Sequence, residues 1–330
     1  MIDMSKRNSA KKTAYFCAII LLVLGMVFGG LQILESTVFY QSQEESAPSV
    51  SKTITKDGIK YFPRQDITVI MVLGIDETGP VVSSGSYRNS GEADAVVLLL
   101  LDQKDETYSV ICLNRDMMVE IPAIGLGGKP AGTEYGQLAL SHTYGEGLHD
   151  SCENTRNTIS GLFGGVVIDH YVSLNMDAIA IVNDAVGGVT VDVVDDFSAV
   201  DASIPMGTVK LSGPQALTFV RTRMDVGNQL NITRMTRHEE YMQGLMDALM
   251  ASLDSSDTFV MELYDQVDEY MVTDCSVNTI SGLLSRCSDY TLKEIVSPEG
   301  DNILGEEYYE FYADEGKLTD LVLRLFYAPK

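Results

Sequence analysis

ITVIMVLGI (residues 67–75), ADAVVLLLLD (93–102) and TYSVICLN (107–114) are three short apolar runs that follow one another closely in the chain. They are rich in β-branched residues, and a turn-like QKDE segment separates the second run from the third. Strands that are apolar on both faces belong in the middle of a covered sheet. These runs therefore predict the central strands of a sheet with a layer packed on each side.

Helical and strand patterns alternate after these runs, which indicates a layered α/β or α+β domain. We expect helices at 137–147, 152–163, 177–186, 213–220, 233–253, 257–271, 276–286 and 315–326, and further strands at 166–174, 189–194, 290–296 and 307–312. No internal repeat interrupts this order, so residues 66–330 are interpreted as one domain.

The N-terminus has the pattern of a membrane anchor. Residues 1–12 hold four basic side chains, and residues 13–34 (TAYFCAIILLVLGMVFGGLQIL) are uncharged and mostly apolar. At about 1.5 Å per residue, such a run is long enough to cross a hydrocarbon core of about 30 Å. The basic flank predicts a cytoplasmic N-terminus and an extracytoplasmic domain, joined by a polar linker at 35–65. A cleaved signal peptide is the alternative, although its apolar region is usually shorter.

The charge balance excludes one large class of partner. The chain has 23 Lys and Arg against 47 Asp and Glu, a net charge of −24. A nucleic-acid-binding protein needs a basic face to neutralise phosphates, so no nucleic-acid partner is expected. Any anionic ligand must be met by a local group of arginines or by a metal ion.

The positions of the cysteines are compatible with disulfide bonds and with free thiols. Cys17 lies in the expected anchor, and Cys112, Cys152, Cys275 and Cys287 lie in the expected extracytoplasmic part. None of their spacings is that of a zinc knuckle. An oxidising exterior permits disulfides among the four, in any of three pairings, and free buried thiols are an equal interpretation.

Two aspartates stand at the ends of neighbouring predicted strands. Asp76 follows the first run directly, and Asp94 stands near the start of the second. Two carboxylates so placed can share a hard cation such as Mg²⁺, which prefers oxygen ligands and often binds together with substrate phosphates. Aspartate is also common in turns for local reasons, so this pair alone is a weak signal.

Arginines form the second group of candidate site residues. Arg115 lies in Asn114-Arg115-Asp116 after the third run, and four more lie within 17 residues, namely Arg221, Arg223, Arg234 and Arg237. The planar guanidinium suits bidentate binding of phosphate. Ion pairs with this acidic surface are the alternative interpretation. Together with Asp76 and Asp94, these arginines fit a diphosphate site.

Seven segments, in this order, resemble successive motifs of the LytR–CpsA–Psr family. They are VLGID (72–76), ADAVVLLLLD (93–102), LNRDMMVEIP (113–122), LALSHTYGEG (138–147), IDHYVSLNMDAIAIVNDAVGGVTVDV (168–193), LSGPQALTFVRTR (211–223) and RMTRH (234–238). The resemblance covers roughly residues 66–253.

The resemblance implies a mixed central sheet between helices, a hydrophobic pocket for a polyprenyl tail and a polar mouth for diphosphate and Mg²⁺. It implies transfer of a glycopolymer from undecaprenyl diphosphate to a wall acceptor, commonly a peptidoglycan hydroxyl. By motif position, the metal-binding residues are Asp76 and Asp94, and the diphosphate-binding residues are Arg115, Arg221, Arg223, Arg234 and Arg237. Arg115, Asp94 and Asp116 are the candidate catalytic residues, the two aspartates being candidates for the general base.

Several positions depart from the family pattern. Glu77 and Glu92 stand where the family often has arginine, and Arg88 in the loop between them is a candidate replacement. Asn231 stands where the family has Asp, and His238 stands where it has Gln; a neutral His238 can take over the hydrogen bonding of that Gln in diphosphate binding, and proton transfer is its alternative role.

Two other functions compete with the transferase. A diphosphatase would use the same residues with water as the acceptor. A membrane-anchored lipid-binding or regulatory protein without catalysis is the second alternative, motivated by Glu77 and Glu92.

Overall fold

The computed structural model describes residues 53–329, apart from 126, 223–225, 227–236, 238–239, 242, 246, 250, 253–254, 257, 288–289 and 306–307. The expected cytoplasmic tail, the anchor at 13–34 and the linker up to residue 52 lie outside the described residues. None of the helices within the described part is long and apolar enough to cross a membrane.

A six-stranded sheet in the order β11-β8-β3-β4-β5-β12 forms the centre of the domain. Its strands are β3 (Ile67–Ile75), β4 (Ala93–Asp102), β5 (Thr107–Leu113), β8 (His170–Asn175), β11 (Met271–Thr273) and β12 (Thr291–Val296). β3 runs parallel to β8, and β5 runs parallel to β12, whereas the other neighbouring pairs are antiparallel. The predicted mixed central sheet is therefore confirmed, with the three apolar runs side by side in it.

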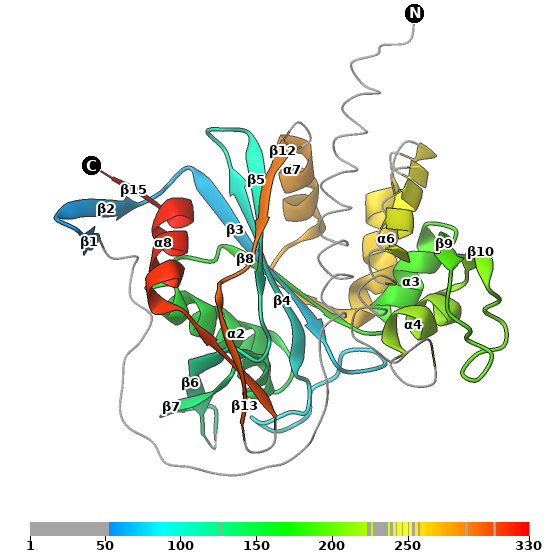
Figure 1. Ribbon diagram of the computed structural model, residues 1–330, viewed down its shortest axis with the longest axis horizontal. Coiled ribbons are helices and arrows are strands. Elements are labelled where there is room, and N and C mark those ends of the chain that lie inside the picture. The colour runs from blue at the N-terminus through cyan, green and yellow to red at the C-terminus, as the bar shows by residue number, and fades with distance from the viewer. Residues whose placement is uncertain are drawn as a thin grey trace, which may run out of the picture.

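Helices cover both faces of this sheet (Figure 1). One face packs against α3 (Ala178–Ala185), α4 (Gly213–Arg221), α6 (Phe259–Val267) and α7 (Val277–Cys287). The other packs against α2 (His149–Leu162) and α8 (Glu315–Phe326). Successive residues of β4 enter the two cores in turn, Val97 and Leu99 on the first face and Val96 and Leu98 on the second. This explains the continuous apolar run, because successive side chains of a strand point to opposite faces.

Hairpins complete the domain around these layers. They are β6 (Met118–Ile124) with β7 (Pro130–Gln137), β9 (Val189–Val193) with β10 (Gly207–Leu211), and β13 (Gly300–Leu304) with β14 (Tyr309–Ala313). The helix expected at 137–147 is only a short 3-10 helix, η1 (Leu138–Thr143). Gly145 and Gly147 follow it with φ of 121° and 81°, a backbone region incompatible with a continued right-handed helix.

The expected linker boundary at residue 65 is wrong. β1 (Ile54–Lys56) and β2 (Ile59–Pro63) form a hairpin, and β2 also pairs with β15 (Tyr327–Pro329) near the end of the chain. The turn is Asp57-Gly58, with φ of 51° and 78°. Asp-Gly is the favoured dipeptide for such two-residue turns, because both positions need a positive φ. The folded domain therefore begins at least twelve residues earlier than the apolar pattern indicates.

The four described cysteines are free thiols, with Cys112 partly buried and the other three buried. Burial raises the pKa of Cys152 to about 12 and the pKa values of Cys275 and Cys287 to about 11. These thiols therefore stay protonated at neutral pH in the free protein.

Candidate active site

The junction of β3 and β4 holds the two predicted metal-binding aspartates. Gly74 pairs with Ala95, but Ile75 pairs with Ala93, so Asp94 is the extra residue of a β-bulge. A bulge re-aims the side chain of its extra residue and is common beside active sites. The backbone N–H groups of Asp76 and Asp94 both donate to the carbonyl oxygen of Glu92, at 3.0 and 3.1 Å. Asp76 and Asp94 are thus held at one corner of the sheet.

Arg115 lies among three carboxylates at this corner. It follows β5, the neighbour of β4, and its Nη1 pairs with Oδ1 of Asp94. Its Nη2 is 3.4 Å from Oε2 of Glu92, and its Nε is 3.6 Å from Oδ1 of Asp116. The buried Nε has no hydrogen-bond partner. The guanidinium is therefore fixed by charge and keeps one donor unused.

Asp116 is only 5% exposed and is held from several sides. Its backbone N–H donates to Oδ1 of Asn114, and Nε2 of Gln137 donates to its carboxylate at 3.0 Å. Burial raises the pKa of Asp116 to about 6, against the opposing effect of Arg115 and with smaller contributions from Asp94 and Glu92. A carboxylate with a pKa near 6 is mostly ionised at neutral pH yet accepts a proton more readily than an ordinary aspartate.

Glu92 adds a further carboxylate to this corner, beside those of Asp76, Asp94 and Asp116. Burial raises the pKa of Glu92, Arg115 opposes the rise, and the charges of Asp94 and Asp76 add to it. Among the described residues, the four carboxylates of Asp76, Glu92, Asp94 and Asp116 thus face two guanidinium groups, those of Arg115 and Arg221. Such an excess of oxygen ligands suits a divalent cation.

Arg221 reaches the same corner from α4, one of the helices on the first face of the sheet. It is the last residue of α4, which begins with a Ser212–Gln215 capping box and Pro214 in the first turn. Its Nη2 is 4.0 Å from Oδ1 of Asp76, and both side chains are exposed. At this distance and exposure the pair contributes little to stability, so both groups are free to meet a ligand.

Arg237 is placed differently from the other predicted diphosphate ligands. It is 4% exposed, and its Nη2 donates to the carbonyl oxygen of Thr222 at 2.8 Å. Its Nε is 3.7 Å from Asp195, and its guanidinium lies 5.3 Å from the ring centre of Phe197. Burial lowers its pKa, with Asp195 opposing. Nε and Nη1 of Arg237 have no hydrogen-bond partner, and its role in diphosphate binding stays a prediction.

Arg88 and Glu77 both lie in the loop that joins β3 to β4. The guanidinium of Arg88 lies 3.8 Å from the ring centre of Tyr144, whose hydroxyl binds Glu134. Oε1 of Glu77 accepts a hydrogen bond from Ser90. The role of Arg88 in diphosphate binding stays a prediction, as do those of Arg223, Arg234 and His238, which lie outside the described residues together with Asn231.

The segment 137–147 supports this loop, a role that the motif did not indicate. The side-chain amide of Asn89 donates to the carbonyl oxygens of His142 and Gly145, each at 3.0 Å. Nδ1 of His142 lies 2.8 Å from the carbonyl oxygen of Gly91, next to Glu92. Burial lowers the pKa of His142 to about 4, so it is neutral at physiological pH and is a structural group.

A cavity of about 200 Å³ lies at the opposite end of β3 and β4, where Thr68 pairs with Leu101. It is lined by Thr68, Leu101, Gln103, Glu106, Leu283, Arg286, Cys287 and Tyr290. It is smaller than the roughly 300–1,000 Å³ of typical ligand pockets. The hydrophobic tail pocket that the resemblance implies therefore stays a prediction.

Comparison with known proteins identifies the family of this chain. The LytR_cpsA_psr family profile matches residues 34–322, and the chain therefore belongs to this family. Among curated relatives, a protein of Oceanobacillus iheyensis named polyisoprenyl-teichoic acid–peptidoglycan teichoic acid transferase TagU is 25% identical over 94% of this chain and 93% of its own length. The TagU of Bacillus subtilis is 24% identical, with 97% of each chain covered.

Solved structures agree on the fold. The crystal structure of B. subtilis TagV has a TM-score of 0.55 at 22% identity and covers 79% of this chain and 96% of its own. The structure titled TagT bound to LI-WTA has a TM-score of 0.54 at 22% identity, with 87% and 98% covered. Protein gbs0355 of Streptococcus agalactiae has a TM-score of 0.60 at 20% identity, with 79% and 86% covered.

Proposed function

We propose that this protein is a membrane-anchored phosphotransferase that moves a glycopolymer from a polyprenyl diphosphate carrier to a peptidoglycan hydroxyl. The observation that carries the proposal is the corner formed by Asp76, Asp94, Arg115 and Arg221, where charged groups from β3, β4, β5 and α4 converge. Family membership and the transferase names of the curated relatives support the same reaction. The apolar run at 13–34 supports an N-terminal anchor with the domain outside the cell.

The arginines are proposed to hold the diphosphate. Arg221 offers an exposed guanidinium, and Arg115 offers contacts to Glu92 and Asp94 that a more highly charged anion would replace. Glu92 lies 3.4 Å from Arg115 and competes with the diphosphate for it. The acidic corner therefore favours a diphosphate that arrives with a divalent cation over a bare anion.

The corner fits Mg²⁺ by the chemistry of its donors. Asp76 has an exposed carboxylate, whereas the carboxylate of Asp94 is already paired with Arg115. Mg²⁺ usually takes one or two protein carboxylates and completes its octahedron with water and substrate phosphates. Asp76 would be the primary ligand and Asp94 the second. A bound Mg²⁺ would supply neutralisation of charge on the non-bridging oxygens.

The reaction is a displacement at phosphorus. The acceptor hydroxyl oxygen forms a bond to the phosphorus that bears the glycan, and the bond from that phosphorus to the bridging oxygen breaks. Polyprenyl phosphate leaves with the electron pair, and a phosphodiester joins the glycan to the acceptor. The hydroxyl proton passes to Asp116, whose pKa near 6 suits a base at neutral pH. Arg115 and Arg221 stabilise the charge on the transferred phosphoryl group and the leaving group.

Two alternatives share these residues. A diphosphatase would release free glycan phosphate, because water would take the place of the acceptor hydroxyl. A lipid-binding or regulatory protein without turnover would follow if Glu92 and Glu77 had removed diphosphate affinity, and the contact between Glu92 and Arg115 is the observation that favours it.

A binding experiment tests whether the corner binds diphosphate together with Mg²⁺. The full chain in detergent is titrated with a short polyprenyl diphosphate, with and without Mg²⁺, while thermal unfolding is followed. A ligand that binds only the folded state adds about 2.7 kcal/mol at 100 times its dissociation constant. We expect a Mg²⁺-dependent rise in Tm that Asp76→Ala removes. An unchanged Tm at saturating ligand would reject the proposed diphosphate site.

A further inference from the structure

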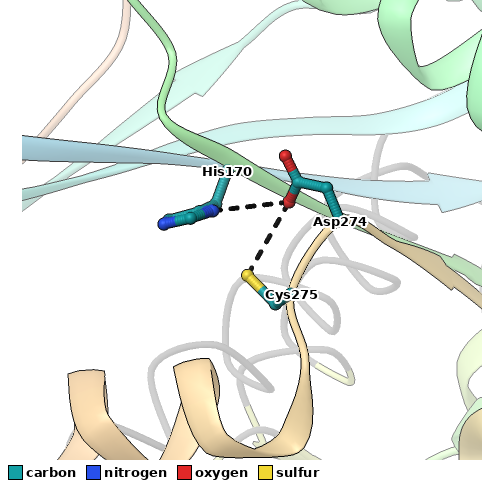
Figure 2. A group of neighbouring side chains, drawn as sticks. All are labelled: His170, Asp274 and Cys275. Carbon is teal, nitrogen blue, oxygen red and sulfur yellow. Dashed lines mark hydrogen bonds and ion pairs between the residues drawn. The ribbon is translucent and has the colours of Figure 1, made fainter.

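Three potential metal ligands meet at the end of the sheet away from the active site. His170 is the first residue of β8, and Asp274 and Cys275 follow β11, which pairs antiparallel with β8 (Figure 2). Strands β3 and β8 run parallel, and His170 of β8 lies opposite Ile70 of β3. At the active-site end of the same pair, Asn175 lies opposite Ile75. Five residues of strand therefore separate the two sites, roughly 17 Å.

The distances among these three side chains already resemble a coordination sphere. Nδ1 of His170 is 3.5 Å from Oδ1 of Asp274, and Sγ of Cys275 is 3.7 Å from the same oxygen. All three ligand atoms lie within 4.8 Å of one another. A tetrahedral zinc ion with bonds of about 2.0–2.3 Å would place neighbouring ligand atoms roughly 3.3–3.6 Å apart. Only shifts of a few tenths of an ångström to about 1 Å are needed to close around an ion.

The surrounding groups hold the ligands in this orientation. Oδ1 of Asp274 accepts a hydrogen bond from the backbone N–H of Tyr171 at 3.0 Å, and Oδ2 lies 3.5 Å from Nη1 of Arg156. Oδ1 is thus the oxygen that faces His170 and Cys275. The backbone N–H of Cys275 donates to Oγ1 of Thr273 at 3.0 Å, which fixes the chain beside the thiol. Supporting hydrogen bonds of this kind commonly orient metal ligands.

Access to the cluster suits a small ion better than an organic substrate. The side chains of His170 and Asp274 are 29% and 25% exposed, whereas Cys275 is only 4% exposed. An ion can enter over the imidazole and the carboxylate, but a bulky electrophile cannot approach Sγ. Within the described part of the chain, no other set of three His, Cys, Asp or Glu ligand atoms lies this close together.

We propose that His170, Asp274 and Cys275 bind a Zn²⁺-like divalent transition-metal ion through imidazole nitrogen, carboxylate oxygen and thiolate sulfur. A mixed N, O and S set selects such an ion over Mg²⁺ and Ca²⁺, which prefer oxygen ligands alone. The thiol of Cys275 loses one proton to solvent on binding, and its thiolate and the carboxylate balance the charge of the ion. The fourth coordination position is open to water.

The position of the cluster indicates what the ion does. It joins the start of β8 to the junction between β11, an edge strand of the sheet, and α7, which begins at Val277. α7 contributes Leu283 and Cys287 to one of the two cores. The ion therefore stabilises the attachment of this helix to the sheet, and this role does not depend on the transferase proposal.

Cobalt is a direct probe of the proposed sulfur ligand. The full chain, prepared without a polyhistidine tag and kept in a non-thiol reductant, is titrated with Co²⁺ alone. We expect one equivalent of Co²⁺ to give a thiolate-to-metal charge-transfer band and the visible bands of a four-coordinate ion. Cys275→Ser should abolish the charge-transfer band, whereas Cys287→Ser, a buried thiol at the far end of α7, should retain it.

A second variant keeps the test decisive if Cys275→Ser fails to fold. His170→Asn, at a partly exposed position, should weaken Co²⁺ binding at least tenfold and remove the rise in Tm that Zn²⁺ gives the wild type. A wild-type chain without a thiolate band at saturating Co²⁺ would overturn the proposal. So would a band of equal strength in Cys275→Ser, or Co²⁺ affinity unchanged in His170→Asn.

Discussion

Asp76 and Asp94 share one backbone acceptor, since the N–H groups of both residues donate to the carbonyl oxygen of Glu92. This arrangement couples the end of β3 to the bulged start of β4. It holds the two carboxylates at one corner, where Asp94 also pairs with Arg115 and Asp76 stays exposed. Removing the carboxylate of Asp76 should therefore affect chemistry more than folding.

Asp76→Asn should reduce transfer on the order of a hundredfold or more, because the proposed primary ligand of the charge-neutralising Mg²⁺ is lost. Its side chain is exposed, so the free energy of unfolding should change by less than about 0.5 kcal/mol. Initial rates and thermal unfolding of the same preparations check both values. Asp301→Asn, on the exposed strand β13, is the matched control. Wild-type rates in Asp76→Asn would mean that the metal site is misplaced.

Arg221→Ala should impair the reaction more than Arg88→Ala. Arg221 faces Asp76, whereas Arg88 lies against Tyr144. We expect kcat/KM for the lipid-linked donor to fall at least tenfold, about 1.4 kcal/mol, in the first variant and less in the second. Steady-state kinetics with varied donor concentration measure this. The reverse order would place the diphosphate near Arg88.

Asp116→Asn should change how stability depends on pH. Burial gives Asp116 a folded-state pKa of about 6, above the value of about 3.9 in an unfolded chain. Between these values the folded state binds the proton more tightly, so wild-type stability falls as pH rises from about 4 to 6. The loss is at most about 3 kcal/mol, at 1.36 kcal/mol per unit.

The asparagine has no such titration and keeps an oxygen to accept the hydrogen bond of Gln137. As pH rises across this range, the Tm of the wild type should therefore fall relative to the Tm of Asp116→Asn. Parallel Tm profiles of the two proteins would contradict the raised pKa. If Asp116 is the base, the same variant should also be strongly impaired in transfer at every pH.

Gly213→Ala should destabilise the helix that carries Arg221. A Cβ at Gly213 would lie 2.5 Å from the carbonyl oxygen of Ala180 and 2.6 Å from Oδ2 of Asp184. Overpacking of this kind typically costs about 1–3 kcal/mol. Gly161→Ala, where a helical Cβ meets nothing within 4 Å, is the control and should be neutral or slightly stabilising. Equal Tm values for the two variants would contradict the close contact between α3 and α4.

The core of the fold could be predicted because its signal is local. The three apolar runs became adjacent strands with the expected bounds to within one residue, and the helix at 315–326 was placed correctly. The β1–β2 hairpin was missed because its short strands are polar and only the Asp57-Gly58 turn marks it. The β6–β7 hairpin was missed because β6 contains Pro122, and because β7 (PAGTEYGQ) holds two Gly residues and few apolar ones.

The site could be predicted only as a set of residue types. Aspartates at strand ends and clustered arginines indicated Asp76, Asp94, Arg115 and Arg221, but not which carboxylate meets which guanidinium. That depends on the bulge at Asp94, which apolar patterning does not reveal. Three further features depend on long-range packing. They are the hydrogen bond from Gln137 to Asp116, the contact between His170 and Asp274, and the burial of Arg237.

Transfer of a labelled glycan tests the central claim most directly. The full chain in detergent is incubated with a glycan-labelled polyprenyl diphosphate donor and peptidoglycan, with and without Mg²⁺, and wild type is compared with Asp76→Asn. We predict that label becomes covalently bound to peptidoglycan while an equal amount of polyprenyl phosphate appears, and that Asp76→Asn or omission of Mg²⁺ prevents both. Folded wild-type protein that releases only soluble glycan phosphate, or leaves the donor intact, would contradict the account.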